Sequence, residues 1–326
     1  MRDIVLMPPN WLGDVILAQP ALRALSLAFK SDKLYIVGRP WLVDVVPFLN
    51  LEHPQVEYLT TIPKHADKVF LFPNSLSSGI QAFRSRAKER IGFKSEGRGI
   101  LLTHAYRSRI DMIHEHHRRY FIDLLQQYGI ATLFDDVELK TPVGNGNQTP
   151  NQTMSLLKEK GINSSKFICV APGAQFGGAK RYPAEAYAHI LSWLSQEGWD
   201  VVVLGTAAER DIATACLSKT TGTYWNAAGE TSLSQALGLV SETHLMLCND
   251  SGLMHVAAGL GVPTVAMFGA TDPQRTSPSG KKVKVLYKPA ACSPCLQREC
   301  HTLGHPCMGN ILPEMVRDAC LSFLNE

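Results

Sequence analysis

The 326-residue sequence has few cysteines, no uninterrupted apolar run of membrane-spanning length and almost no excess of charge. Eight cysteines in a chain of this length exclude a disulfide-stapled mini-protein, and several stand in apolar or helix-like stretches, which favours free thiols in a reducing compartment. The longest stretch without Asp, Glu, Lys or Arg, 251–271, is interrupted by four glycines and a proline, so it does not predict a membrane span. The net charge is only +3, and we expect no nucleic-acid partner.

Two further signals are missing near the start of the chain. The apolar run after Met1 is closed by Pro8-Pro9 without a small-residue cleavage site, which is not a secretory signal, so we expect an intracellular protein. Pro8-Pro9-Asn10-Trp11 stands where a dinucleotide-binding protein has G-x-G-x-x-G, which excludes an NAD-dependent dehydrogenase.

Short apolar runs alternate with helical patterns, which is typical of repeated β-α units. We predict strands at 2–7, 33–38, 69–72, 166–171, 200–204, 244–248 and 263–267. We predict helices at 14–29, 76–88, 108–128, 183–197, 207–217, 231–240, 251–260 and 313–325. A polar segment rich in Gly, Pro and Asn, 140–153, separates the halves. The predicted fold class is α/β, with two Rossmann-like doubly wound domains, 1–150 and 151–326, facing a central cleft.

One region is strongly basic. From Arg84 to Arg119 there are ten Lys or Arg against four Asp or Glu, with four histidines among them. Such a region attracts an anionic partner, either a phosphorylated substrate or an acidic membrane surface, although a solvated helix face gives the same pattern.

A second local feature is a cysteine cluster near the end of the chain. Cys292, Cys295, Cys300 and Cys307 fall within sixteen residues and include one C-x-x-C pair. Four thiolates in tetrahedral array would hold a structural zinc ion, whereas the alternatives are free thiols or oxidised pairs on a surface loop. The spacing matches no established zinc-finger pattern.

An acid follows the first strand. Asp14 lies after the turn Asn10-Trp11-Leu12-Gly13, at the start of a predicted helix. An Asp in this position commonly caps the helix by accepting backbone N–H bonds. The alternative is catalytic, because a carboxylate above the carboxyl end of a strand can accept a proton from an attacking hydroxyl.

Two strand-turn-helix segments in the second half favour an anion. The first, 171–183, contains three glycines and Lys180, so backbone N–H groups and one ammonium group can approach a phosphate; it lacks the Gly-Lys pair of a Walker A loop. The second, 247–258, places Asp250 and Ser251 as natural caps before Gly252, which leaves the positive helix end open, with His255 one turn further on. His255 has a purely structural interpretation as well.

In this order, the motifs resemble the ADP-heptose–lipopolysaccharide heptosyltransferase family over nearly the whole chain. The resemblance rests on Gly13-Asp14, Pro73-Asn74-Ser75, PGAQFGGAKRYP, LGTAAERD, AGETSL and NDSGLMHVAAGLGVPTVAMFG. It implies a two-domain glycosyltransferase B fold, with the acceptor bound mainly by the first domain and the sugar nucleotide by the second. The last helix would pack back on the first domain.

The resemblance also implies roles for individual residues. Asp14 would be the general base, and Lys180 would be catalytic through its contact with the donor phosphate. Donor binding would further use Gly173 and Glu209, the latter at the nucleotide ribose, together with Asp250, Ser251, Gly252 and His255. We assign acceptor binding to Asn74 and Ser75 and, within the basic region, to Arg84 and Lys88.

The implied reaction moves a heptose from ADP-L-glycero-D-manno-heptose to the inner-core heptose of lipopolysaccharide, with inversion and without a required cofactor. The acceptor is attached to lipid A, so we expect a cytoplasmic protein in peripheral contact with the inner membrane. One alternative is another inverting transferase of the same family with a different nucleotide sugar or acceptor. A second is a non-catalytic protein that binds a nucleotide sugar or zinc.

Overall fold

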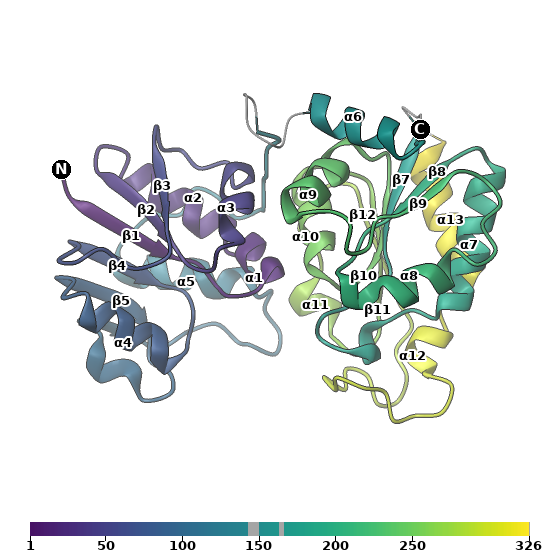
Figure 1. Cartoon of the computed structure of the whole chain (residues 1–326). Coiled ribbons are helices and arrows are strands. Elements are labelled where there is room, and N and C mark those ends of the chain that lie inside the picture. Colours follow the sequence, from purple (N-terminus) through teal and green to yellow (C-terminus); the bar gives the residue numbers. More distant parts are fainter. Residues whose placement is uncertain (143–149, 163–165, 326) are drawn as a thin grey trace. The chain divides into compact units, whose positions relative to one another are not determined.

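The computed structural model describes residues 1–142, 150–162 and 166–325 (Figure 1). The chain forms two compact units, Met1–Lys140 and Thr141–Glu326. The predicted linker, 140–153, includes residues 143–149, which lie outside the described residues. The predicted boundary at residue 150 therefore stays a prediction.

The first unit is built on a six-stranded sheet in which every pair of neighbouring strands is parallel. The strand order is β3-β2-β1-β4-β5-β6. The strands are β1 (Asp3–Met7), β2 (Lys33–Val37), β3 (Val56–Leu59), β4 (Lys68–Leu71), β5 (Glu89–Phe93) and β6 (His104–Tyr106). The central strand β1 reads as an apolar run because helices cover both faces of a parallel sheet.

The second unit repeats this topology. Its parallel sheet has the order β12-β11-β10-β7-β8-β9. The strands are β7 (Phe167–Ala171), β8 (Asp200–Val203), β9 (Tyr224–Asn226), β10 (Met246–Asn249), β11 (Thr264–Phe268) and β12 (Val283–Tyr287). In each unit the first strand lies beside the fourth, so the order reverses between β1 and β4 and between β7 and β10. Open α/β sheets bind ligands at such a reversal, outside the carboxyl ends of the strands.

The helices of the first unit form two groups. Helices α1 (Leu12–Leu17), α2 (Gln19–Ala28) and α5 (Arg118–Tyr128) contact one another, while α4 (Leu76–Arg84) contacts η2 (Arg98–Leu101). Ala82 of α4 packs with Val5, Val69 and Leu71 in one buried cluster. Two short helices follow β2, namely α3 (Leu42–Val45) and η1 (Val46–Phe48).

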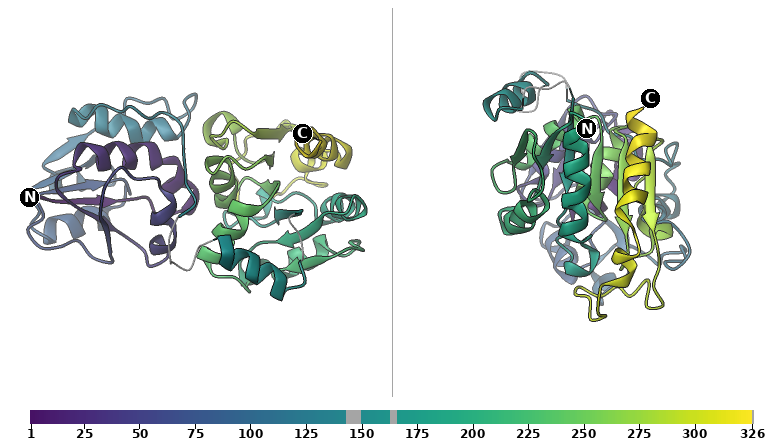
Figure 2. Two further views of the ribbon diagram at one scale, coloured as in Figure 1. Left: turned by 90° about the horizontal axis from the view of Figure 1, so that it is seen from above. Right: turned by 90° about the vertical axis from the view of Figure 1, so that its right-hand side faces the viewer.

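In the second unit, α7 (Ala184–Gln196) lies between α8 (Arg210–Cys216) and α13 (Pro313–Leu324), and α7 and α13 run side by side in Figure 2. Helix α9 (Leu233–Glu242) contacts α6 (Pro150–Glu159) and α10 (Gly252–Gly259). The short helices are η3 (Gly178–Lys180), η4 (Ala207–Glu209), α11 (Pro273–Thr276) and α12 (Pro306–Gly309). Helix α13 also packs on β11 and β12, and its predicted contact with the first domain stays a prediction.

The predicted fold class is confirmed, but several predicted helices were wrong in extent. The helix predicted at 76–88 ends at Arg84. The helix predicted at 14–29 is two helices, because Pro20 in the first turn of α2 lacks the N–H that a continuous helix needs. The helix predicted at 108–128 begins only at Arg118, since the Asp111 carboxylate accepts the Ile113 N–H at 2.8 Å and holds a local turn.

Five strands were not predicted, namely β3, β5, β6, β9 and β12. Four of them are sheet edges, whose partly exposed residues give a weak apolar signal, and β5 begins with two charged residues. Among the described residues, no helix combines the length and the apolar composition that crossing a bilayer requires.

Candidate active site

Asp14 lies at the reversal of strand order in the first unit, in the first turn of α1 just after β1. The helix begins at Leu12 with Trp11 as its N-cap residue, so Asp14 stands in the first turn and is not the N-cap residue. Its side chain is 38% exposed, and His117 Nε2 lies 3.9 Å from Asp14 Oδ1. The carboxylate is therefore open to a ligand and lies beside an imidazole.

His117 joins Asp14 to the segment after β4. The His117 ring stacks on Tyr120, with 5.7 Å between centroids and 8° between planes. The Tyr120 hydroxyl accepts a hydrogen bond from Asn74 Nδ2 at 2.6 Å. Asn74, which follows β4, thus lies across the reversal from Asp14, at the same carboxyl edge of the sheet. In the sequence His117 is evident only as one of the histidines of the basic region, because a residue 103 positions from Asp14 carries no local signal of contact with it.

Ser75 begins α4, and the buried Arg98 fixes the turn before it. Ser75 Oγ accepts the Ser78 N–H at 3.3 Å. The Arg98 guanidinium, fully buried, donates to Ser78 Oγ at 2.7 Å and to the carbonyl oxygens of Pro73 and Phe93. Burial lowers the pKa of Arg98 from its ordinary value. Five neutral oxygen acceptors around one cation make this turn rigid.

Arg84 and Lys88 lie away from Asn74 and Ser75. Arg84 ends α4, and Lys88 stands just before β5, at the amino edge of the sheet. The Lys88 ammonium group pairs with Asp67 at 2.7 Å. The structure therefore does not bring the four predicted acceptor residues together.

A different pair of cations lies at the carboxyl edge. Lys94 follows β5 and Arg107 follows β6, and both line an open pocket of about 700 Å³. The pocket is also lined by Ser95, Glu96, Gly97, Gly99, Ile100 and Ala105. It adjoins the start of α4, since Ser95 Oγ donates to the Asn74 carbonyl and Glu96 accepts the Leu76 N–H at 3.0 Å.

In the second unit, Lys180 ends a turn that follows β7, and Asn249 holds this turn in place. Asn249 is fully buried at the end of β10. Its Nδ2 donates to the Pro172 carbonyl at 2.6 Å, and its Oδ1 accepts the Tyr182 N–H at 3.1 Å. The loop between these two residues is therefore bound at both ends to the neighbouring strand. The role of Asn249 was not predicted from the sequence.

Lys180 and Asp250 form a pair at the reversal between β7 and β10. Lys180 Nζ lies 2.5 Å from Asp250 Oδ2, and the two side chains are 14% and 6% exposed. Thr271 Oγ1 donates to the same oxygen at 2.6 Å. Lys180 has two further donor hydrogens, because an ammonium group carries three.

Helix α10 begins beside this pair with an open amino end. The helix starts at Gly252 with Ser251 in the N-cap position, as expected, although the Ser251 side chain makes no cap hydrogen bond. Asp250 binds Lys180 and is not a cap. Ser251 Oγ is buried and has no hydrogen-bond partner in the described chain. His255 is buried in the first two turns. N–H groups, a hydroxyl and an ammonium group thus converge where an anionic ligand would satisfy them.

Glu209 lies against Gly173 in the same unit. It accepts hydrogen bonds from Thr206 N at 2.8 Å and Thr206 Oγ1 at 2.9 Å, both at Oε2. A Cβ atom on Gly173 would lie 2.0 Å from the other oxygen, Oε1. Glycine at 173 therefore allows the carboxylate to reach the loop after β7. All the predicted donor residues lie in this unit, around the carboxyl ends of its strands.

Comparison with known proteins identifies the family. The model of glycosyltransferase family 9 (heptosyltransferase) matches residues 62–305. The chain belongs to glycosyltransferase family 9. The predicted family and the predicted transferase activity are thereby confirmed.

Individual relatives of this family 9 glycosyltransferase match most of its length. It is 30% identical to lipopolysaccharide heptosyltransferase 2 of Escherichia coli over 310 residues, which cover 87% of each chain. It is 28% identical to lipooligosaccharide heptosyltransferase 2 of Campylobacter jejuni over 94% of this chain and 95% of that protein. The solved structure of E. coli ADP-heptose lps heptosyltransferase II superposes with a TM-score of 0.80 at 25% identity, covering 99% and 98% of the two chains.

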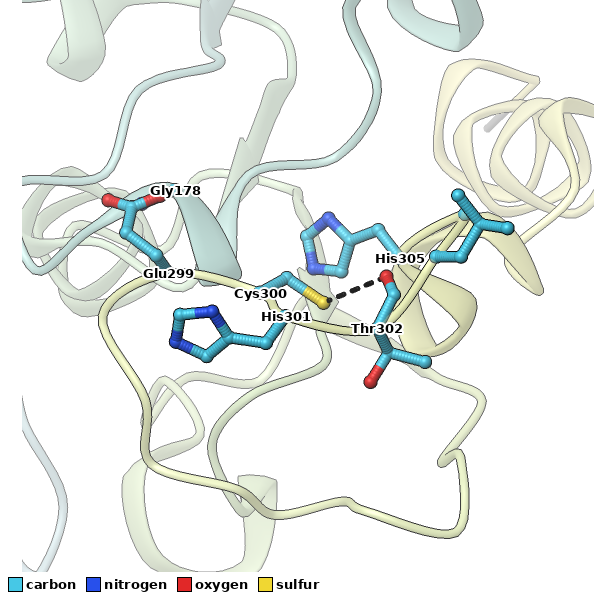
Figure 3. Close-up of a pocket in the computed structure, with 8 residues that line it drawn as sticks. Gly178, Glu299, Cys300, His301, Thr302 and His305 are labelled. Carbon is cyan, nitrogen blue, oxygen red and sulfur yellow. Dashed lines mark hydrogen bonds between the residues drawn. The ribbon is translucent and has the colours of Figure 1, made fainter.

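The cysteine cluster of this glycosyltransferase consists of free thiols. Cys292 is exposed, Cys295 and Cys300 are partly exposed, and Cys307 is buried. Within the part of the chain that the structure describes, no group of three or more His, Cys, Asp or Glu side chains is arranged to hold a metal ion. The suggested zinc site thus gains no support from the arrangement of these thiols. Cys300 and His305 line a shallow pocket of about 570 Å³ beside Gly178 (Figure 3).

The thiols are expected to differ sharply in reactivity. Burial raises the pKa of Cys169, Cys216 and Cys320 to about 12, so at pH 8 they remain protonated and enclosed, and the thiolate is the reactive form. Alkylation of the native protein at pH 8, followed by peptide mass spectrometry, should modify Cys292 first and leave these three unmodified until denaturant is added. Labelling of Cys169 as fast as Cys292 would contradict this arrangement.

Proposed function

We propose that this glycosyltransferase transfers a heptose from ADP-L-glycero-D-manno-heptose to the inner-core heptose of lipopolysaccharide. Its similarity to proteins named lipopolysaccharide heptosyltransferase 2 and lipooligosaccharide heptosyltransferase 2 supports the proposal. The observation that carries the proposal is the Lys180–Asp250 pair beside the open end of α10. This is a site for the diphosphate of a sugar nucleotide, placed where α/β sheets bind such ligands.

The donor would bind across the β7/β10 reversal. The diphosphate would accept hydrogen bonds from Lys180, from the first N–H groups of α10 and from Ser251 Oγ, whose hydrogen-bonding capacity is otherwise unused in the described chain. Asp250 would keep Lys180 in position through the 2.5 Å contact. Glu209 Oε1, against Gly173, would accept from a ribose hydroxyl.

The reaction would be a single in-line displacement. The acceptor hydroxyl attacks the anomeric carbon, the bond from that carbon to the diphosphate oxygen breaks, and ADP leaves from the opposite face, which inverts the configuration. The hydroxyl proton passes to Asp14, and one carboxylate suffices because no glycosyl-enzyme is formed. Negative charge grows on the departing phosphate, where a preorganised donor such as Lys180 contributes about 3–4 kcal/mol by analogy with oxyanion holes. With these donors in place, we propose that no metal cofactor is needed.

The acceptor would lie along the carboxyl edge of the first unit. Asn74 is hydrogen-bonded to Tyr120, which stacks on His117 beside Asp14, and Ser75 follows Asn74 in the chain. We assign the anionic part of the acceptor to the pocket with Lys94 and Arg107. Arg84 and Lys88 are less suitable, because they stand at and beyond the end of α4, away from Asn74, and Lys88 is paired with Asp67.

One face of α4 would contact the inner membrane from the cytoplasmic side. Leu76, Ile80 and Phe83 are spaced at i, i+4 and i+7 and are 42%, 40% and 53% exposed. The short helix η2 packs on α4, and its Ile100 is 90% exposed. The pocket with Lys94 and Arg107 adjoins the start of α4. Apolar side chains and cations together suit an acidic lipid surface to which the acceptor is anchored.

The donor specificity can be tested directly. Purified protein is incubated with heptosylated lipid A core and either ADP-heptose or a UDP-sugar, and nucleotide release and product mass are followed. We expect turnover with ADP-heptose, persisting in EDTA, and none with UDP-sugars. Turnover with a UDP-sugar alone would favour another transferase of the same family, and no turnover with any nucleotide sugar would favour a binding protein.

Asp14→Asn should lower kcat about 100-fold or more, because the amide cannot accept the hydroxyl proton. ADP affinity, measured by titration calorimetry, should stay near the wild-type value, since the donor residues are in the other unit. Glu57→Gln, at an exposed carboxylate on edge strand β3, is the matched control and should be near normal. A near-normal kcat for Asp14→Asn would remove Asp14 from the reaction.

Lys94→Ala and Arg107→Ala should each raise the acceptor KM several-fold and reduce its salt dependence, while leaving the donor KM unchanged. Steady-state kinetics at two salt concentrations make the measurement. Arg84→Ala provides the comparison at the far end of α4 and should leave the acceptor KM unaltered. If only Arg84→Ala raises the acceptor KM, the anionic group binds at the amino edge instead.

A further inference from the structure

The segment Cys292–Cys307 takes no part in the proposed reaction, yet it lies directly on the turn that presents Lys180. This turn comprises Gly177, Gly178, Ala179 and Lys180 and includes η3. Figure 3 shows the segment running past Gly178, with Glu299, Cys300 and His301 along it and His305 further on. Contact between two loops more than a hundred residues apart suggests that one supports the other.

Three hydrogen bonds join the segment to consecutive residues of the turn. The Ala179 N–H donates to the Arg298 carbonyl at 2.9 Å, and the Gly178 N–H donates to Glu299 Oε1 at 3.1 Å. His305 Nε2 lies 2.9 Å from the Ala179 carbonyl oxygen, to which it must donate. Both peptide groups before Lys180 are therefore bound by the segment, which fixes the direction in which the Lys180 side chain leaves the backbone.

The segment lies so close to the turn that positions 177 and 178 require glycine. A Cβ atom on Gly177 would lie 2.1 Å from the Arg298 carbonyl oxygen, and one on Gly178 would lie 2.4 Å from Glu299 Oε2. The two glycines thus allow backbone and carboxylate to reach the turn, so part of the glycine content of this loop serves contact with the segment.

The segment also reaches the other side of the Lys180–Asp250 pair. The Leu296 N–H donates to the Ala270 carbonyl at 2.9 Å, next to Thr271, whose hydroxyl binds Asp250. On the Lys180 side, the Arg298 guanidinium lies 5.4 Å from the centroid of the Phe176 ring, and Lys180 Nζ lies 4.9 Å from the same centroid. One segment therefore contacts both loops that hold the pair.

We propose that the segment Cys292–Cys307 positions Lys180 for the donor phosphate, with Arg298, Glu299 and His305 as the positioning residues. The inference rests on the proposed function, because it takes Lys180 as the phosphate contact. These residues act through the backbone of the turn. Loosening them should weaken binding of the donor diphosphate and leave acceptor binding unchanged.

Glu299→Ala and Glu299→Gln provide the main test. Alanine removes the acceptor of the Gly178 N–H, whereas the glutamine amide oxygen retains it. We expect about tenfold weaker ADP binding and a similarly raised donor KM for alanine, since a hydrogen bond to a charged group is lost, with the acceptor KM unchanged. Glutamine should restore most of the affinity. The matched control, Asp318→Ala, removes an exposed carboxylate of α13 and should resemble wild type.

Arg298→Ala is a second variant that keeps the backbone hydrogen bond to Ala179. It removes only the contacts with Phe176 and should raise the donor KM less than Glu299→Ala does. Lys281→Ala, at an exposed cation, is its control. Melting temperatures are measured for all variants, and equal increases in donor and acceptor KM together with a lower Tm would show a merely structural role and overturn the inference.

Lys180→Ala separates the two hypotheses. If Lys180→Ala binds ADP as tightly as wild type, the proposed phosphate role fails and the positioning role with it. If Lys180→Ala binds ADP weakly while Glu299→Ala binds it normally, the function stands and the positioning role is overturned. If glutamine at 299 is as damaging as alanine, the hydrogen bond to the Gly178 N–H is not what supports donor binding, which also overturns the positioning role.

Discussion

The reversal of strand order at the centre of each sheet is the constraint on which the candidate site depends. Where a parallel sheet reverses its order, the chain after one strand and the chain after its neighbour leave toward opposite faces, so space remains between them at the carboxyl edge. Asp14 follows β1 and Asn74 follows β4 at one reversal, while Lys180 follows β7 and Asp250 follows β10 at the other. Each unit thus holds its candidate residues at the same place in the same topology.

Three buried polar side chains of the second unit hold the Lys180 ammonium group and its loop in position. Asn249 fixes the loop that precedes Lys180, Asp250 pairs with its Nζ, and Thr271 fixes Asp250. A nearly buried charge is costly unless it is paired and hydrogen-bonded, so each of these partners also stabilises the fold. The cysteine-rich segment adds a further layer, because it binds the backbone on which Lys180 stands. Positioning of the cation and stability of the unit are therefore linked.

Candidate residues within short motifs were predictable, and those defined by distant contacts were not. Asp14, Lys180 and Ser251 stand in the turns and helix starts that follow apolar strands, where periodicity and turn residues locate them. His117 beside Asp14, Asn249 under the Lys180 loop, and Lys94 with Arg107 at one edge come together only through sheet pairing. Arg84 and Lys88 were wrongly grouped with Asn74 and Ser75, since their charge is evident in the sequence but they lie at the opposite edge of the sheet, at and beyond the end of α4.

The sequence alone determined the α/β class, most of the central strands, the loops that carry Asp14 and Lys180, and the family, because these are recorded in periodicity and in contiguous motifs. The tertiary structure decided the strand order, the Lys180–Asp250 pair and the support of the Lys180 turn by Glu299. These contacts join residues 70 and 121 positions apart. Their formation depends on which strands pair and which loops then meet, and no local pattern of residues encodes that.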